Sequence, residues 1–154
     1  MLEDKLHVLI VEARFYAEIA DEMLAGAGDA LHAFGAEFDV ISVPGAFELP
    51  AAVAMAHEGA HRPAGVRYDG YVALGCVIRG ETTHYDYVCS ESARGLMDLS
   101  IAKNLAIGYG VLTVEDSDQA WARARRSQGD KGGAAARACM DMIVLRRRLF
   151  GQIR

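Results

Sequence analysis

Three observations predict an α/β fold with a mostly parallel four-stranded sheet and helices on both faces. Short apolar runs alternate along the chain with longer segments whose apolar residues recur at helical spacing. The short runs are almost continuously apolar, which is typical of strands buried on both faces of a parallel sheet. Each helical segment is long enough to return the chain for the next strand in a right-handed crossover. We therefore expect three layers, with helices, sheet and helices in that order.

Four segments carry the strand pattern: residues 6–11, 38–43, 71–78 and 106–114. The chain is expected to leave the first strand over residues 12–15. Pro44-Gly45 ends the second strand, and glycines in the fourth allow another backbone to approach closely. A surface connection over residues 62–68 precedes the third strand.

Helical spacing begins near Ile19 and ends at Gly35, which resembles a C-terminal cap. A second helix is expected over residues 48–59, where Pro50 is tolerated in the first turn. A third is expected over residues 85–104. Asp116, three residues before Gln119, signals the start of a fourth helix. The last helix is expected over residues 134–150, after glycines that interrupt the pattern: Gly129, Gly132 and Gly133.

The size and composition predict one globular domain over residues 1–154. The chain is too short for two ordinary domains, and no apolar run approaches the roughly 20 residues that span a bilayer. Residues 1–5 lack an apolar secretory region, which predicts a cytoplasmic protein. The net charge of −5, with both signs interspersed, argues against a nucleic-acid surface. For the basic run 146–148 we favour cations at the negative end of a helix over a polyanion site.

The three cysteines give no sign of a metal or disulfide framework. Cys76, Cys89 and Cys139 are odd in number and lack metal-ligand spacing. We interpret them as reduced packing residues rather than catalytic thiols.

The segment from Gly75 to Val88 joins the end of a buried strand, a tight polar loop and the start of a helix that carries His84. An anion held there could meet backbone N–H groups at a helix N-terminus, two threonine hydroxyls and Arg79. The His84 imidazole can move a proton at neutral pH. Phe15 and residues 46–48 also lie just beyond the carboxyl ends of predicted strands, the edge where open α/β sheets bind ligands. These features predict a phosphate-bearing substrate that undergoes acid–base chemistry.

The same segment reads G-x-V-I-R-G-x-T-x-H-Y-D-Y-V and resembles the signature of the lumazine synthase family. Four other pieces agree in order: Ala-Arg-Phe at 13–15, Val-Pro-Gly-Ala-Phe-Glu-Leu-Pro at 43–50, Tyr-Gly-Val-Leu-Thr at 109–113 and Asp-Lys-Gly at 130–132. The resemblance covers the chain from about residue 6 to the C-terminus. It implies a flavodoxin-like three-layer sandwich.

The resemblance also implies a reaction. Family members condense 5-amino-6-(D-ribitylamino)uracil with 3,4-dihydroxy-2-butanone 4-phosphate to 6,7-dimethyl-8-ribityllumazine, releasing phosphate and water, in riboflavin biosynthesis. The reaction uses no cofactor and no metal. The protein must orient two substrates, bind phosphate and transfer protons.

The resemblance assigns His84 to proton transfer. The phosphate-bearing substrate would be held by Glu81 and Thr82, through their backbone N–H groups and the Thr82 hydroxyl, and by Arg123, with Arg125 and Arg126 as competitors for that role. The uracil would stack on Phe15. The rest of its site would comprise Ala46, Phe47, Glu48, Cys76, Val77, Ile78, Tyr109 and Lys131. Tyr109 departs from the phenylalanine or other apolar residue expected at its position.

In this family each active site lies between neighbouring subunits of a homopentamer, or of a multiple of pentamers that extends to a 60-subunit shell. Phe15, Glu48 and His84 would come from one chain, and Tyr109, Arg123 and Lys131 from the next. Riboflavin synthase is a candidate partner.

Two kinds of alternative stay open at this point. One is a lumazine- or flavin-binding or shell-forming paralogue with little catalysis. The other is an enzyme of related fold that dismutates two lumazines into riboflavin. The joint presence of Glu48, His84, Arg123 and Lys131 favours the synthase.

Overall fold

Four parallel strands form a single sheet at the centre of the molecule. The computed structural model describes residues 5–152, and its strands are β1 (His7–Ala13), β2 (Glu37–Val43), β3 (Gly70–Ile78) and β4 (Ile107–Val114). Their order across the sheet is β2-β1-β3-β4, and every pairing is parallel. The predicted parallel four-stranded sheet is confirmed.

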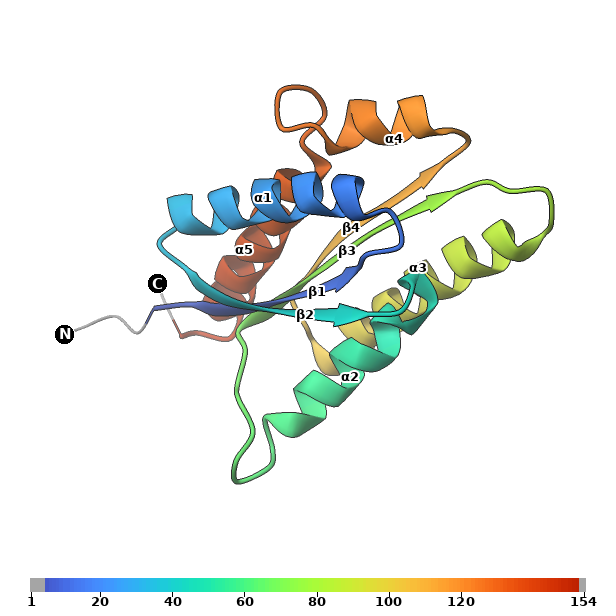
Figure 1. The fold of residues 1–154 in the computed structure, drawn as a ribbon. Coiled ribbons are helices and arrows are strands. Elements are labelled where there is room, and N and C mark those ends of the chain that lie inside the picture. The colour runs from blue at the N-terminus through green and yellow to red at the C-terminus, as the bar shows by residue number, and fades with distance from the viewer. Residues whose placement is uncertain (1–4, 153–154) are drawn as a thin grey trace.

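Helices cover both faces of the sheet (Figure 1). On one face lie α1 (Ala17–Ala33), α4 (Ser117–Ala124) and α5 (Lys131–Leu149). On the other lie α2 (Leu49–Gly59), which follows a short 3₁₀ helix η1 (Ala46–Glu48), and α3 (His84–Lys103). Two apolar clusters fill the spaces between the sheet and these two layers. The three-layer prediction is therefore confirmed, and the carboxyl ends of all four strands point to the same edge.

The first strand extends further than predicted. It ends at Ala13 rather than at residue 11, and Glu12 pairs with Ser42 of β2 and Leu74 of β3. Glu12 is only 3% exposed. A carboxylate tolerates such burial when a cation and hydrogen bonds compensate for the lost water, and Arg14 supplies both.

The last helix begins three residues earlier than predicted, and α3 begins at His84 rather than at residue 85. Gly132 and Gly133 lie in the first turn of α5, where Asp130 accepts a hydrogen bond from the Gly133 N–H (3.3 Å). A Cβ on Gly132 would lie 2.2 Å from the Met23 carbonyl oxygen. Gly132 thus allows α5 to pack closely on α1, and Gly133 leaves room for the Asp130 side chain at the helix start, so the prediction that these two glycines interrupt the helix was wrong.

The other helix-end signals behave as predicted. Asp116 accepts a hydrogen bond from the Gln119 N–H (2.9 Å) at the start of α4, and Gly35 follows α1 with a φ of 75°. Arg146 donates to the carbonyl of Asn104 (2.8 Å), the residue that caps the C-terminus of α3. The basic run thus places a cation at a helix end. None of the helices within residues 5–152 is long and apolar enough to cross a membrane.

Close packing of β4 on α5 gives a stability prediction. A Cβ on buried Gly108 would lie 1.9 Å from the Ala135 carbonyl oxygen, so Gly108→Ala requires a backbone shift. We expect a loss of about 1–3 kcal/mol in the free energy of unfolding, measured by urea denaturation at a fixed protein concentration.

Gly59→Ala is the matched control, because nothing lies within 4 Å of a Cβ built there at the end of α2. Its helical position predicts a change of less than about 1 kcal/mol, towards higher stability. Equal effects of the two substitutions would contradict the packing argument.

Candidate functional site

A concave surface of about 850 Å³ opens at the carboxyl edge of the sheet. Four segments that are distant in the sequence form it: the turn after β1, the turn and η1 after β2, the end of β3 and the first turns of α3. We call it the carboxyl-edge site. Of the predicted residues it is lined by Phe15, Ala46, Phe47, Glu48, Cys76, Val77, Ile78 and His84. One surface thus collects residues that the sequence spreads over about half the chain.

Three aromatic side chains in this site are exposed to solvent in the single chain. Phe15 is 75% exposed and Phe47 is 55% exposed, although both are large and apolar. Tyr87, one turn beyond His84 on α3, is 66% exposed. Exposed aromatic faces grouped in a concavity suit a planar ligand or another protein surface.

The side chains at the end of β3 alternate between the two faces of the sheet. Cys76 and Ile78 pack against the apolar cluster beneath α1 and α5, whereas Val77 packs against the cluster on the opposite face. Burial raises the pKa of the Cys76 thiol to about 11, so this thiol is protonated at neutral pH. It is therefore poorly suited to act as a nucleophile.

The loop before α3 lies outside the lining of the carboxyl-edge site but borders it through His84. Both Glu81 and Thr82 are exposed. The Thr82 hydroxyl oxygen accepts a hydrogen bond from the His84 backbone N–H (3.3 Å), which leaves its O–H free to donate. The positive end of the α3 dipole also lies here, so the loop favours an anion.

Arg79 is occupied by neighbouring groups rather than directed at an anion. Its Nε donates to Glu115 (2.8 Å), its Nη1 donates to Asp86 (3.4 Å), and its guanidinium lies over the ring of Tyr85 at 4.3 Å. These contacts tie the loop to β4 and α3. The sequence analysis placed Arg79 among the groups that could contact an anion. Because its guanidinium already has these partners, it is a weak candidate for binding phosphate.

Tyr109, Arg123 and Lys131 gather on a different part of the molecule. They line a cavity of about 340 Å³ beside β4, formed with the first turns of α5, and we call it the cationic surface. The Tyr109 hydroxyl forms a hydrogen bond with the buried Ser92 hydroxyl of α3 (3.3 Å), which restrains the ring. None of the three residues lines the carboxyl-edge site of the same chain.

The structure distinguishes the three arginines at and after the end of α4. Arg126 pairs with Glu22 (3.3 Å) and Asp29 (3.1 Å) of α1, and Arg125 stacks on Trp121. Arg123 donates to the Gln119 carbonyl (3.0 Å), and within residues 5–152 it forms no ion pair. Of the three, Arg123 has the guanidinium most available to an anionic ligand.

The charges of the two surfaces are complementary. The carboxyl-edge site is lined by Glu48 and Glu91, and no Lys or Arg is among its described lining residues. The cationic surface is lined by Arg123 and Lys131, with no carboxylate among the described residues. A phosphate ester bound in the first site would therefore need its charge compensated from elsewhere.

Sequence reasoning missed part of the α3 lining. Tyr87, Val88 and Glu91 follow His84 at intervals of three, four and seven residues and share its helix face. That spacing could have identified them. Within the described part of the chain, no three His, Cys, Asp or Glu side chains are grouped so as to hold a metal ion.

A doubly wound α/β sandwich with a ligand-sized site at the carboxyl edge of its sheet is the architecture of a small-molecule-binding α/β protein. The family model described as 6,7-dimethyl-8-ribityllumazine synthase matches residues 5–147. The chain belongs to the 6,7-dimethyl-8-ribityllumazine synthase family.

Named relatives align with this chain over almost their full length. The chain is 62% identical over 144 residues to 6,7-dimethyl-8-ribityllumazine synthase 1 of Rhizobium meliloti (strain 1021), covering 94% of each chain. It is 60% identical over 147 residues to 6,7-dimethyl-8-ribityllumazine synthase of Agrobacterium fabrum, covering 96% of this chain and 99% of the relative. The protein of that name from Bartonella henselae is 55% identical over 149 residues, covering 97% of this chain and 93% of the relative.

Proposed function

We propose that this chain condenses 5-amino-6-(D-ribitylamino)uracil with 3,4-dihydroxy-2-butanone 4-phosphate to 6,7-dimethyl-8-ribityllumazine, as part of riboflavin biosynthesis. The observation that carries the proposal is the separation of charge between two surfaces. The carboxyl-edge site offers aromatic faces, carboxylates and His84, whereas Arg123 and Lys131 lie on the cationic surface. Neighbouring subunits that join these surfaces form a complete site for a phosphate ester.

The carboxyl-edge site binds the uracil substrate. The exposed ring of Phe15 stacks on the heterocycle, and η1 supplies Ala46 and Phe47 as a second wall. The Glu48 carboxylate accepts hydrogen bonds from ribityl hydroxyls. The backbone at the end of β3 bonds the pyrimidine edge, in keeping with the inward packing of the Cys76 and Ile78 side chains.

The phosphate lies near the N-terminus of α3. Backbone N–H groups at Glu81 and Thr82 and the Thr82 O–H donate to its oxygens, while the Glu81 carboxylate points to solvent. Arg123 of the neighbouring subunit supplies parallel charge-assisted hydrogen bonds that orient and neutralise the leaving group. Lys131 and Tyr109 close the site from that side.

His84 moves the protons. The substrate amine attacks the ketone carbon to form an imine with loss of water, and the leaving phosphate then departs. Ring closure follows with loss of a second water. His84, on the first turn of α3 beside both substrates, accepts and returns protons in these steps.

The proposal includes a homopentamer or a multiple of pentamers, the assembly that the family resemblance implies, in which each site takes residues from two chains. Exposed Phe15 and Phe47 on one surface and the cationic surface beside β4 support a contact between unlike faces, the kind of contact that builds cyclic oligomers when its rotation closes. The cytoplasmic location and the contact with riboflavin synthase stay predictions.

An assay of lumazine fluorescence and released phosphate tests the function. We expect formation well above the spontaneous rate. Arg123→Gln is expected to raise the KM for the butanone phosphate about 10- to 100-fold, the equivalent of a lost charge-assisted hydrogen bond. Arg125→Gln is the matched control, because Arg125 stacks on Trp121 and does not line the cationic surface.

No acceleration by a correctly assembled wild-type oligomer would overturn the proposed activity. Equal effects of the two arginine substitutions would instead leave the activity standing and reject Arg123 as the phosphate ligand.

A further inference from the structure

The turn between β1 and α1 carries Phe15 into the carboxyl-edge site with little help from packing. Phe15 is 75% exposed, and its aromatic neighbour is Tyr16, in an edge-on arrangement with ring centroids 4.9 Å apart. A side chain with so few contacts takes its position from its backbone. Whatever holds this turn therefore sets the place of the ring.

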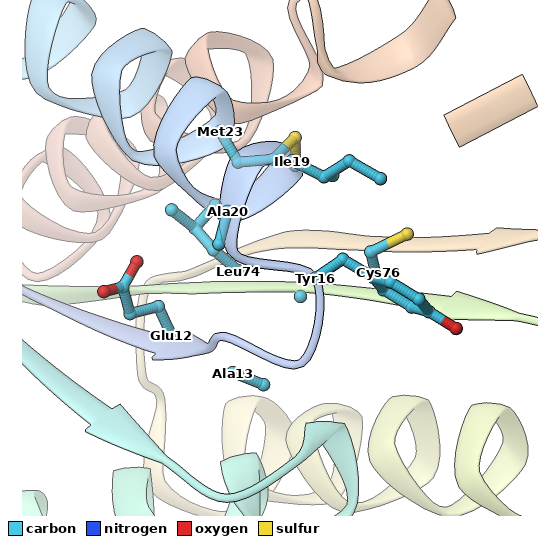
Figure 2. A pocket seen from close by; sticks show the side chains of 9 residues that line it. Glu12, Ala13, Tyr16, Ile19, Ala20, Met23, Leu74 and Cys76 are labelled. Carbon is cyan, nitrogen blue, oxygen red and sulfur yellow. The ribbon is translucent and has the colours of Figure 1, made fainter. Parts of the chain in front are cut away.

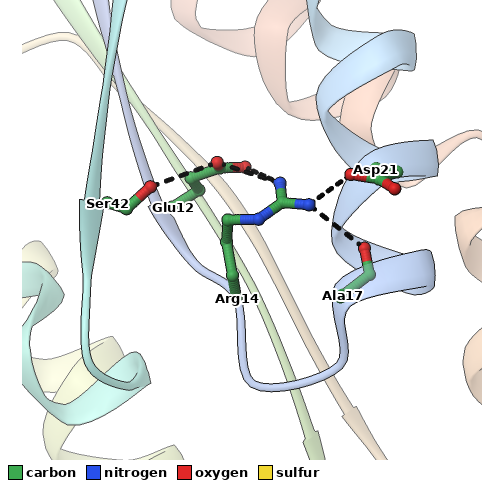
Figure 3. Close-up of polar contacts among 5 residues, drawn as sticks. All are labelled: Glu12, Arg14, Ala17, Asp21 and Ser42. Carbon is green, nitrogen blue, oxygen red and sulfur yellow. Dashed lines mark hydrogen bonds and ion pairs between the residues drawn. The ribbon is translucent and has the colours of Figure 1, made fainter.

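Arg14 holds the turn from both sides (Figure 3). Its Nη1 donates to both carboxylate oxygens of Glu12 (3.0 and 3.1 Å) in β1. Its Nη2 donates to Asp21 and to the Ala17 carbonyl (3.3 Å) in the first turns of α1. The hydrogen bonds with Asp21 and then Glu12 raise the pKa of Arg14 above its ordinary value, so the guanidinium stays charged.

The Glu12 end of this network is rigid. Glu12 is 3% exposed and also accepts a hydrogen bond from the Ser42 hydroxyl of β2 (3.3 Å). It borders an internal cavity between α1 and the sheet, together with Tyr16 and Cys76 (Figure 2). The volume of this cavity is about 10 Å³, room for no more than one water molecule. The carboxylate therefore has little freedom to move, and it provides a firm anchor.

We propose that Arg14 is a positioning residue for the uracil substrate: its hydrogen bonds to Glu12, Asp21 and Ala17 hold the turn so that Phe15 presents its ring to the carboxyl-edge site. This role rests on the proposed function of that site. Arg14 is absent from the lining of the carboxyl-edge site, and its donors are directed to protein acceptors. It therefore acts through Phe15 and not on the substrate.

Steady-state kinetics give the first test. Arg14→Gln is expected to raise the KM for the ribitylaminouracil about tenfold, because a displaced stacking face weakens binding of that substrate. We expect kcat to change less than about threefold and the KM for the butanone phosphate to stay within about twofold, since neither depends mainly on the ring. A matched loss in kcat and both KM values would show general disruption and overturn the proposal.

Arg62→Gln is the matched control. It removes an arginine that pairs with Glu58 (3.1 Å), and that pair lies at the opposite end of α2 from the carboxyl-edge site. We expect no change in either KM. A rise in the KM for the ribitylaminouracil as large as that of Arg14→Gln would contradict a specific role of Arg14.

A double-mutant cycle with Phe15→Ala separates positioning from other effects. If Arg14 acts through the Phe15 ring, Arg14→Gln raises the KM of the Phe15→Ala protein less than about twofold, because the ring is already gone. A further tenfold rise in that background would show that Arg14 acts independently of Phe15 and would overturn the proposal.

Arg14→Gln leaves the Glu12 carboxylate buried without its cation, so this variant could fail to fold. A second variant keeps the test decisive in that case. Asp21→Asn weakens only the α1 end of the network, at an exposed position. It should raise the same KM about threefold and leave the thermal midpoint almost unchanged. If the KM for the ribitylaminouracil is unchanged in Asp21→Asn and Arg14→Gln does not fold, the proposal fails.

A readout that is independent of catalysis distinguishes failure of this inference from failure of the proposed function. In a protein with Phe15→Trp and Trp121→Phe, the sole tryptophan reports on the turn. Adding Arg14→Gln should increase its fast motion in time-resolved fluorescence anisotropy, whereas adding Arg62→Gln should not. Equal motion with and without Arg14 would reject the positioning role even in an active enzyme. Increased motion in a protein without synthase activity would support the anchoring of the turn and reject the function alone.

Discussion

Replacing His84 by alanine is expected to lower kcat about 10²- to 10⁴-fold without abolishing the reaction, the range that general acid–base catalysis contributes. The structure indicates that loss of the His84 side chain costs the fold little stability. His84 is exposed, and within residues 5–152 its side chain forms no hydrogen bond or ion pair. The hydrogen bond from its backbone N–H to the Thr82 hydroxyl does not depend on the imidazole. We expect the free energy of unfolding to change by less than about 0.5 kcal/mol.

The measurement combines single-turnover kinetics with urea denaturation of the same preparations. His61→Ala is the matched control, because His61 is exposed and lies beyond the C-terminal end of α2, away from the carboxyl-edge site. Its kcat should equal that of the wild type. A His84→Ala protein with more than half of the wild-type kcat would exclude proton transfer by this residue as a step that limits the rate.

Mixing two impaired variants is expected to restore activity, because each proposed site takes one half from each of two neighbouring chains. In assemblies formed at random from equal amounts of His84→Ala and Arg123→Gln chains, each half of a site has an even chance of being intact. About one site in four therefore has both halves intact. Assayed with the butanone phosphate well below the KM of the Arg123→Gln protein, the mixture should therefore recover about a quarter of the wild-type activity. Each variant assembled alone should show only its own residual rate.

The control mixes two variants of the same surface, His84→Ala and Glu48→Gln. Every site in that mixture carries a defect in its carboxyl-edge half, so no activity should return. Co-expression, or joint unfolding and refolding, is needed to exchange chains, and size measurements confirm equal assembly of all mixtures. Recovery in the control, or none with Arg123→Gln, would contradict a site shared between chains.

Much of the fold was predictable from local pattern. The continuous apolar runs located all four strands, and Asp116 and Gly35 marked helix ends through capping chemistry that involves only near neighbours. The predictions that were wrong depend on side-chain and packing contacts that the local apolar pattern does not show. Glu12 stays in β1 because Arg14 and Ser42 compensate for its burial. Gly132 lies in α5 where the backbone of α1 approaches closely, and Gly133 leaves room there for the Asp130 side chain.

The same distinction applies to the site. The order of the motifs pointed to its residues and favoured Arg123 over its competitors Arg125 and Arg126, but the sequence did not show which groups engage each arginine. Glu22 and Asp29 of α1 engage Arg126, and Trp121 engages Arg125, which leaves Arg123 as the available cation. Tyr87 and Glu91 share the helix face of His84, so their spacing in the sequence could have identified them as lining residues, but the prediction did not include them.

By itself, the sequence determined the parallel α/β architecture, the family and the set of candidate residues, because apolar periodicity and short motifs are local properties of the chain. Only the tertiary structure decided how these residues divide into a carboxyl-edge site and a cationic surface. That division arises from the strand order β2-β1-β3-β4, which brings the ends of β1 and β3 together and leaves β4 at the edge of the sheet. Contacts between residues about a hundred positions apart are set by packing, and no local pattern encodes them.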